Sequence, residues 1–135
     1  MKASISLTSV SEVGGAFNVT TTTSNGPLAV DFPASPVDSK LTLGAKTSNS
    51  PAVVSLNPAY EGTFKLQTSS WFKAEVNVDK EVVDPSGKDH KRNVVIKNAA
   101  RGSLSGSVNW DGEEGREVEG VVDVSTSNFH VRLNL

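Results

Sequence analysis

Three carboxylates close together in the sequence, Asp111, Glu113 and Glu114, have the clearest catalytic potential. Hydrolysis of a glycosidic bond uses two carboxyl groups at a fixed separation, one as the acid and the other as a base or nucleophile. However, Asp111 is followed by glycine, and Asp-Gly is a common hairpin turn. Carboxylates on a turn are poorly preorganised for catalysis. We therefore rank a glycoside hydrolase as a distant third function and expect this chain not to be an enzyme.

The two histidines, His90 and His130, are the only imidazole bases available to activate a serine nucleophile. His90 lies in a run of mixed charges that predicts a solvated hairpin tip, and His130 is expected to face solvent on a strand. The acidic residues do not have the spacing of a twelve-residue calcium loop. Because the chain has no cysteine, disulfides, thiolate catalysis and cysteine metal sites are excluded. The sequence thus predicts no catalytic residue, no metal and no cofactor.

Trp71 is the best candidate for a binding residue. The apolar residues that follow it occupy even-numbered positions, so Trp71 is predicted to project to the opposite side, beside serine and threonine hydroxyls. An exposed tryptophan can stack on a sugar ring or anchor a protein partner. The interpretation that we favour is that the side chain instead packs across an irregular turn or against Tyr60. The predicted ligand site comprises Trp71, Tyr60, Thr68 and Ser69, and its ligand is a glycan or an unidentified protein.

The elements that must position these residues follow a recurring pattern of an alternating strand and a polar turn. The four turns are Thr23-Ser24-Asn25, Thr47-Ser48-Asn49, Thr68-Ser69-Ser70 and Thr126-Ser127-Asn128. An apolar residue precedes the last residue of each turn by six positions: Val19, Leu43, Phe64 and Val122. Alternation with a period of two indicates strands with one buried face. These four residues are therefore expected to occupy equivalent places around one interior.

The third turn departs from the others. After it, the apolar residues are displaced by one position relative to the other three copies. A displacement of one residue would turn every following side chain to the wrong face of the sheet. We therefore expect a bulge or an altered turn at Trp71.

The whole chain, residues 1–135, is predicted to be a single all-β domain, because no segment has sustained helical periodicity. Matching offsets favour an irregular β-solenoid or β-roll of short strands. The alternative is an antiparallel β-sandwich built from successive hairpins. Trp110 is in phase with the buried set and is expected in the core. Strands are predicted near residues 3–8, 16–23, 28–32, 40–46, 52–56, 62–69, 72–79, 92–98, 102–109, 117–125 and 129–135.

The pattern of alternating apolar residues, Thr-Ser-Asn and a second alternating strand resembles adhesin-like domains of unknown function, whose repeated strands form β-solenoids or β-rolls. The stretch from Tyr60-Glu61-Gly62 through Asp84-Pro85-Ser86-Gly87-Lys88 and Trp110-Asp111-Gly112 to Asn128 is also similar to uncharacterised fungal proteins with that organisation. The resemblance covers most of residues 17–135. It implies an all-β surface or interaction module, a non-enzymatic binding or structural protein.

Charge and hydropathy limit the possible partners. The net charge of −2 gives no electrostatic reason to expect nucleic acid or an anionic membrane as a partner. No stretch is long and apolar enough for membrane insertion, and the N-terminus lacks the apolar run of a signal peptide. A cytoplasmic location is expected unless an export segment precedes this chain. The strand ending at Leu135 is predicted to be an edge strand, through which a homodimer could pair.

Overall fold

A computed structural model describes residues 2–6, 16–34, 40–58, 60–79, 81, 91–110 and 120–135. Within these ranges the protein is all-β, as predicted, and has no helix. The strands are β1 (Lys2–Ser6), β2 (Ala16–Thr22), β3 (Leu28–Ala34), β4 (Lys40–Thr47), β5 (Ala52–Ser55), β6 (Gly62–Gln67), β7 (Ala74–Asn77), β8 (Arg92–Ala100), β9 (Ser103–Trp110), β10 (Gly120–Thr126) and β11 (Val131–Asn134).

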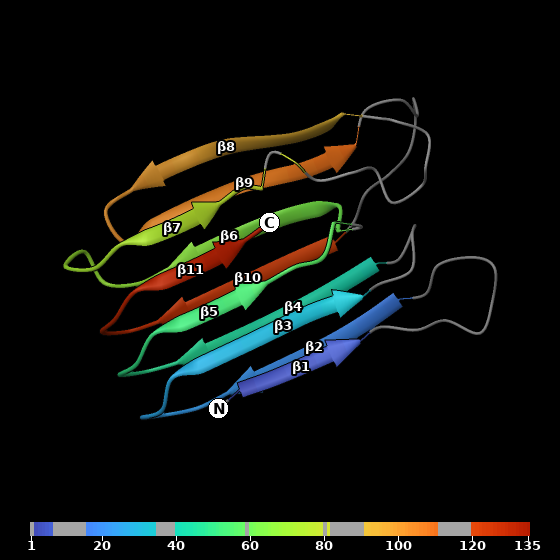
Figure 1. Ribbon diagram of the computed structural model, residues 1–135. Helices are drawn as coiled ribbons and strands as arrows, with labels where there is room; N and C mark the ends of the chain where they lie inside the picture. Colours follow the sequence, from blue (N-terminus) through green and yellow to red (C-terminus); the bar gives the residue numbers. More distant parts are fainter. Residues whose placement is uncertain are drawn as a thin grey trace.

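The strands form two facing sheets (Figure 1). A five-stranded sheet has the order β1-β3-β5-β11-β7, and all its pairings are parallel. A six-stranded sheet has the order β2-β4-β10-β6-β9-β8. It is parallel from β2 to β6 and antiparallel where β9 and β8 are added. The polar turns therefore connect one sheet to the other instead of joining hairpin partners.

We call each strand-turn-strand unit that crosses between the sheets an arch. The four arches are β2–β3, β4–β5, β6–β7 and β10–β11, and the last of these, residues 120–135, is the C-terminal arch. In the six-stranded sheet, Val19 pairs with Leu43, Leu43 pairs with Val122, and Val122 pairs with Phe64. The four residues predicted to be equivalent thus occupy one row across four neighbouring strands.

The spatial order of the arches differs from their order in the sequence. The C-terminal arch lies between β4–β5 and β6–β7, which follow one another in the chain. Strand β11 pairs with β5 on one side and with β7 on the other. The prediction that the C-terminal strand forms an edge was therefore wrong, because both of its backbone edges are already hydrogen-bonded within the chain.

The core lies between the two sheets and is built from the inward-facing side chain of every second residue. Burial alternates strictly along β4, β6, β10 and β11, as the period-two pattern requires. The largest side chains with almost no solvent exposure are Phe32, Phe64, Leu28, Leu43, Leu66, Leu133, Val30, Val54, Val108, Val122, Val124 and Val131.

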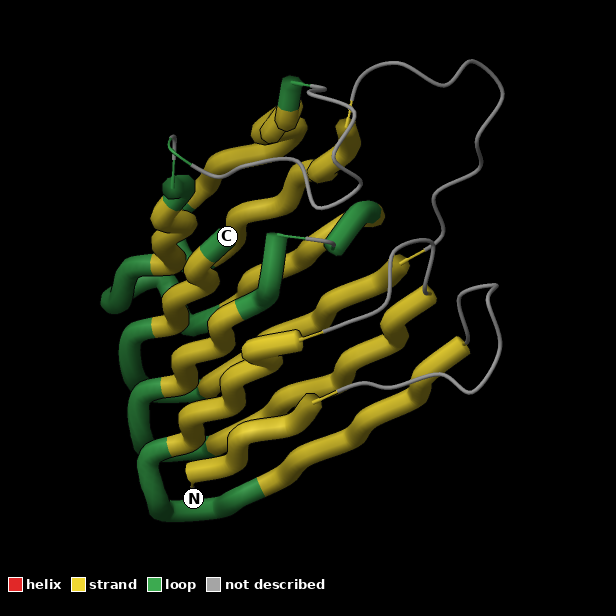
Figure 2. Tube along the Cα trace, turned by 45° about the vertical axis from the view of Figure 1, so that its right-hand side comes forward, coloured by secondary structure: helices red, strands yellow, loops and turns green. Residues whose placement is uncertain are grey.

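The Thr-Ser-Asn sequence has a physical explanation at the turns, which Figure 2 shows one above another along one side of the molecule. The first residue of a turn donates a hydrogen bond to a carbonyl in the next arch, as Thr47 does to Gly26 and Thr126 to Ser50. Thr68 continues this series by donating to Phe129. The threonines therefore bond each arch to its neighbour across the whole stack.

The asparagines at the end of the turns form a second ladder. Asn49 Nδ2 donates to Asn25 Oδ1 at 2.9 Å, and Asn128 Nδ2 donates to Asn49 Oδ1 at 2.9 Å. This ladder ends at the β6–β7 arch, because Ser70 stands there in place of asparagine. Its side chains are exposed, so each bond contributes modestly to stability.

Replacing Asn49 by alanine is expected to lower the free energy of unfolding by about 1–2 kcal/mol, because two ladder bonds are lost at once. The matched control is Asn25→Ala, which removes only one bond and should cost about half as much. Urea denaturation followed by far-UV circular dichroism measures both. Equal losses in the two variants would contradict a continuous ladder.

The turn of the β6–β7 arch contains one residue more than that of the C-terminal arch. Gln67 pairs with Ser125 before the turns, and Ala74 pairs with Val131 after them. The additional residue restores the inward alternation in β7, so Val76 pairs with the buried Leu133. The altered turn predicted at Trp71 is confirmed.

Candidate functional site

Four ring-bearing residues gather on the turns of the two neighbouring arches β6–β7 and β10–β11. We call this group, Trp71, Phe72, Phe129 and His130, the aromatic corner. The Trp71 side chain is 91% exposed, the largest exposure among the large apolar side chains of the described residues. Trp71 therefore projects from the corner, and the favoured expectation that it packs across the turn or against Tyr60 was wrong.

The other three rings pack together. The rings of Phe72 and Phe129 stack with their centroids 5.8 Å apart and their planes at 12°. His130 meets both rings edge-on, at centroid distances of 5.6 Å and 5.3 Å. The 2.6 Å bond from the Thr68 hydroxyl to the Phe129 carbonyl joins the same two turns. The turn that carries Trp71 is thus anchored to the C-terminal arch, while the indole itself is open to solvent.

A shallow hollow of about 260 Å³ adjoins this corner on the outward face of the five-stranded sheet. It extends over β5, β11 and β7, so it begins one residue away from Phe72 and includes His130 itself. Its lining combines apolar surface with charged and polar groups that can act as hydrogen-bond partners. The lining residues are Pro51, Ala52, Val53, Lys73, Glu75, His130 and Arg132.

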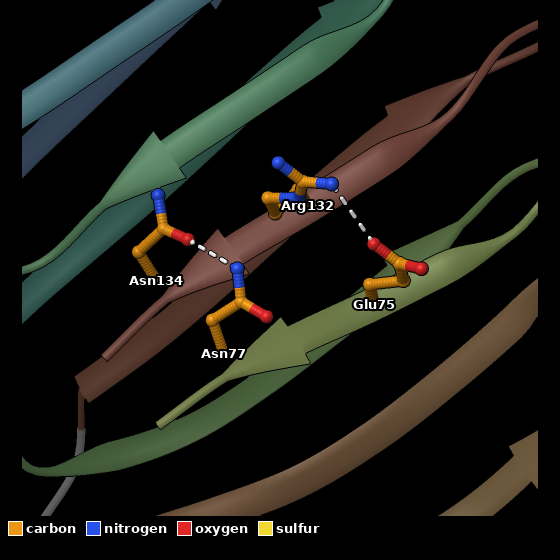
Figure 3. Close-up of polar contacts among 4 residues, drawn as sticks. All are labelled: Glu75, Asn77, Arg132 and Asn134. Atoms are coloured by element: carbon orange, nitrogen blue, oxygen red, sulfur yellow. Dashed lines mark hydrogen bonds and ion pairs between the residues drawn. The ribbon is translucent and has the colours of Figure 1, made fainter. Parts of the chain in front are cut away.

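Two residues that line the hollow, Arg132 on β11 and Glu75 on β7, form an ion pair, which Figure 3 shows. Arg132 Nη2 lies 3.1 Å from Glu75 Oε2, and the two side chains are 51% and 42% exposed. An ion pair this open to water contributes little to stability, so both groups can exchange this contact for one with a ligand. Next to it, Asn77 Nδ2 donates to Asn134 Oδ1 at 3.1 Å, and Asn134 in turn donates to Ser55 Oγ at 3.0 Å. These two hydrogen bonds link the outward-facing side chains of β7, β11 and β5 next to the hollow.

The structure brings three of the four predicted ligand residues together and separates the fourth. Thr68, Ser69 and Trp71 lie in one turn, where the Thr68 hydroxyl is bonded to Phe129 and Ser69 Oγ is buried without a partner among the described residues. Tyr60 precedes β6 while Trp71 follows it, and the six residues of that strand span about 20 Å. Tyr60 therefore cannot act with Trp71 on one small ligand.

Tyr60 has a structural role at its own end of β6. Its side chain is 5% exposed, and its hydroxyl donates to the Thr63 carbonyl at 2.6 Å. Burial raises the pKa of Tyr60 well above the ordinary value, so its phenol stays neutral. The assignment of Tyr60 to the ligand site is therefore corrected to a place in the core.

Reasoning from the sequence missed the part of the site that comes from the C-terminal arch, namely Phe129, His130 and Arg132. His130 is exposed as predicted, but its neighbours from β7 could not be known without the order of the arches. The equal offsets of the four turns were the available signal, because they place Phe129 beside the third turn once the two arches are adjacent.

The remaining candidates do not build a second site. Asp111, Glu113, Glu114 and His90 lie outside the described residues. Trp110 is only half-buried, and its indole donates to the Pro58 carbonyl at 2.9 Å. In the described part of the chain, no three potential metal ligands cluster together, and no helix could cross a membrane.

Arg92 lies beside Trp110, with its guanidinium carbon 5.9 Å from the indole ring centroid. Burial lowers the pKa of Arg92, and the charge of Asp79 opposes that effect. A cation over an aromatic face is a common way to stabilise a partly buried guanidinium. We therefore interpret this pair as support for the end of the β8–β9 hairpin.

No protein-family model, curated protein or solved structure matches this chain. The function must therefore be inferred from the geometry and chemistry of the site itself.

Proposed function

We propose that this chain is a non-enzymatic binding module and that it binds carbohydrate at the aromatic corner and the adjacent hollow. The observation that carries the proposal is the 91% exposure of Trp71, which lies two residues before Lys73, a residue that lines the hollow together with Glu75 and Arg132. The apolar face of a sugar ring stacks on an indole, while its hydroxyls need the donors and acceptors that charged side chains offer. The adhesin-like sequence resemblance agrees with a surface-recognition role.

We further propose that the arches constitute an irregular β-solenoid. In-register parallel pairing across four arches supports this architecture, as do the threonine and asparagine ladders at the turns. The antiparallel hairpin β8–β9 extends one sheet at the end of the stack and makes the array irregular. In this architecture the turns lie in one continuous row. Among the described turns, the β6–β7 turn, which carries Trp71 and Phe72, has one residue more than the others.

Binding to a glycan array tests the function. The wild-type chain is expected to retain a defined set of glycans, and Trp71→Ala is expected to weaken binding roughly tenfold or more, the effect of losing about 1.4 kcal/mol. Its free energy of unfolding should change by less than about 0.5 kcal/mol, because the indole makes little contact with the rest of the protein.

The matched control is Val95→Ala, which removes an exposed apolar side chain from β8, a strand outside both arches that form the corner. Glycan binding by this variant should equal that of the wild type. If the wild-type chain retains no glycan, or if Trp71→Ala binds as well as Val95→Ala does, the carbohydrate proposal is wrong.

A further inference from the structure

The hollow beside the aromatic corner has a charge opposite in sign to that of the whole chain. Lys73 and Arg132 contribute two positive charges to its lining and Glu75 contributes one negative charge, which leaves a net charge of +1 with His130 neutral. The whole chain has a net charge of −2. An anionic ligand is therefore attracted to this part of an otherwise acidic protein.

Every polar side chain that lines the hollow can carry a charge. The lining contains lysine, glutamate, histidine and arginine, and none of the described residues that line it has a hydroxyl or amide side chain. Hydroxyl and amide groups are common partners of neutral ligand groups, whereas cationic side chains bind carboxylates and similar oxyanions through charge-assisted hydrogen bonds. The composition of the lining thus favours a ligand that is itself charged.

Arg132 keeps most of its hydrogen-bonding capacity free. Its Nη2 donates to Glu75 Oε2 at 3.1 Å, and the guanidinium makes no other hydrogen bond to the described residues. Figure 3 shows its other terminal nitrogen on the side away from Glu75. A guanidinium has five N–H donors in a planar fork that matches the two oxygens of a carboxylate. Arg132 can therefore hold Glu75 and an incoming anionic group at the same time.

Lys73 is a second cation at the hollow, and it has no ion-pair partner among the described residues. Its side chain is exposed, but its backbone is fixed, because Val131 N donates to the Lys73 carbonyl at 3.1 Å. Along the chain it lies two residues after Trp71 and two residues before Glu75. Lys73 therefore extends positive charge from the ion pair of Arg132 toward the turn that carries Trp71.

The separation between Trp71 and Arg132 limits the size of the ligand. Glu75, the register neighbour of Arg132 on β7, follows Trp71 by four residues, and four residues span at most about 14 Å. An oligosaccharide of a few rings can bridge a separation of this size. One ring would stack on the indole, and an acidic group farther along would meet the guanidinium.

We propose that the carbohydrate bound at this site is acidic, with a carboxylate or sulfate group held by Arg132 and Lys73 while a neighbouring ring stacks on Trp71. This inference rests on the proposed function, because it specifies which class of glycan the same site binds. An acidic peptide would pair with the two cations but would not supply a sugar ring for the indole. The exposed Trp71 therefore favours a glycan over a peptide as the source of the negative charge.

Binding to matched pairs of glycans tests the inference. Each pair contains an acidic glycan and its neutral counterpart: oligogalacturonides as free acids and as methyl esters, sialylated glycans with and without sialic acid, and galactose oligosaccharides with and without sulfate. In at least one pair, the wild-type chain is expected to bind the acidic member roughly tenfold or more tightly. The carboxylate and sulfate pairs show which of the two groups is preferred.

The same experiment separates the two proposals. If neutral glycans bind as tightly as acidic ones in every pair, the preference for an acidic glycan is wrong and the proposed function stands. If no glycan of either kind binds, the proposed function fails as well.

Two substitutions at the ion pair should change the preference in opposite directions. Arg132→Gln removes the planar fork and is expected to weaken binding of the acidic glycan roughly tenfold or more. Glu75→Gln removes the one carboxylate in the lining and is expected to strengthen that binding roughly threefold or more. The readout is the ratio of the affinities within a pair, which a purely structural effect would leave unchanged. Both side chains are about half exposed, so both variants should fold, and far-UV circular dichroism checks this.

A lysine of the other sheet provides a charge-matched control. Lys73→Gln and Lys46→Gln remove the same charge, but Lys46 is exposed on β4, in the six-stranded sheet. Lys73→Gln should lower the ratio of affinities, and Lys46→Gln should leave it unchanged. Equal effects of the two variants, or binding of polyglutamate as tight as that of the acidic glycan, would show that charge alone is recognised and would overturn the inference.

Discussion

Replacing Gly62 by alanine is expected to lower the free energy of unfolding by about 3 kcal/mol or more, or to prevent folding. Gly62 has a φ of +150°, a backbone conformation that residues with a side chain rarely adopt. A Cβ at this position would overlap the backbone of Gly120, its register partner on β10. The substitution therefore strains β6 and also pushes on the C-terminal arch.

A second glycine of the same sheet is the matched control. Gly44 lies within β4, and a Cβ added there would have no atom within 4 Å. Gly44→Ala is therefore expected to leave stability unchanged or to raise it by up to about 1 kcal/mol, because alanine reduces the entropy of the unfolded chain. Urea denaturation monitored by far-UV circular dichroism compares the two variants. Equal stability would contradict the close approach of β6 and β10.

Truncating Phe64 to alanine is expected to lower the free energy of unfolding by about 3–5 kcal/mol, the cost typical of removing a buried phenylalanine. The Phe64 side chain is 2% exposed and lies inward on β6, where Val122 is its register partner on one side and Gly106 on the other. Gly106 leaves space for the ring, because a Cβ there would lie only 2.7 Å from the ring atom Cζ. Truncation would therefore leave a cavity that these neighbours cannot readily fill.

The neighbouring residue provides the control for Phe64. Lys65 is exposed on the outward face of the same strand, so Lys65→Ala should change the free energy of unfolding by no more than about 0.5 kcal/mol. Chemical denaturation curves of the two variants measure the difference. Adjacent residues on a strand face opposite sides. If Lys65→Ala lowered the free energy of unfolding more than Phe64→Ala, the register of β6 would be displaced by one residue.

The alternation of apolar and polar residues predicted the inward side chains of the arches, although Trp110 on β9, expected in the core, is only half-buried. Val19, Leu43, Phe64 and Val122 were assigned to equivalent positions from their offsets alone, and the structure places them in one row of register partners. The displaced pattern after the third turn likewise predicted the irregularity that exposes Trp71. These predictions succeeded because residues close together in the chain determine which side chains of a strand point inward and which shape a turn adopts.

The composition of the site was less accessible to prediction. Tyr60 was grouped with Trp71 because both lie near one strand in the sequence, but an extended strand carries its two ends far apart. In contrast, Phe129, His130 and Arg132 are distant from Trp71 in the sequence, and they reach the corner or its hollow through the pairing of β11 with β7.

The sequence by itself determined that this protein is all-β, which side chains of each arch point inward, and where the polar turns join the two strands of each arch. Only the tertiary structure decided the order of the arches and, with it, the insertion of the C-terminal arch and the assembly of the aromatic corner. The physical reason is that the arches present similar apolar faces and similar turns, so several stacking orders satisfy the same local pattern. The choice among them depends on long-range pairing and on side-chain fit in a shared core.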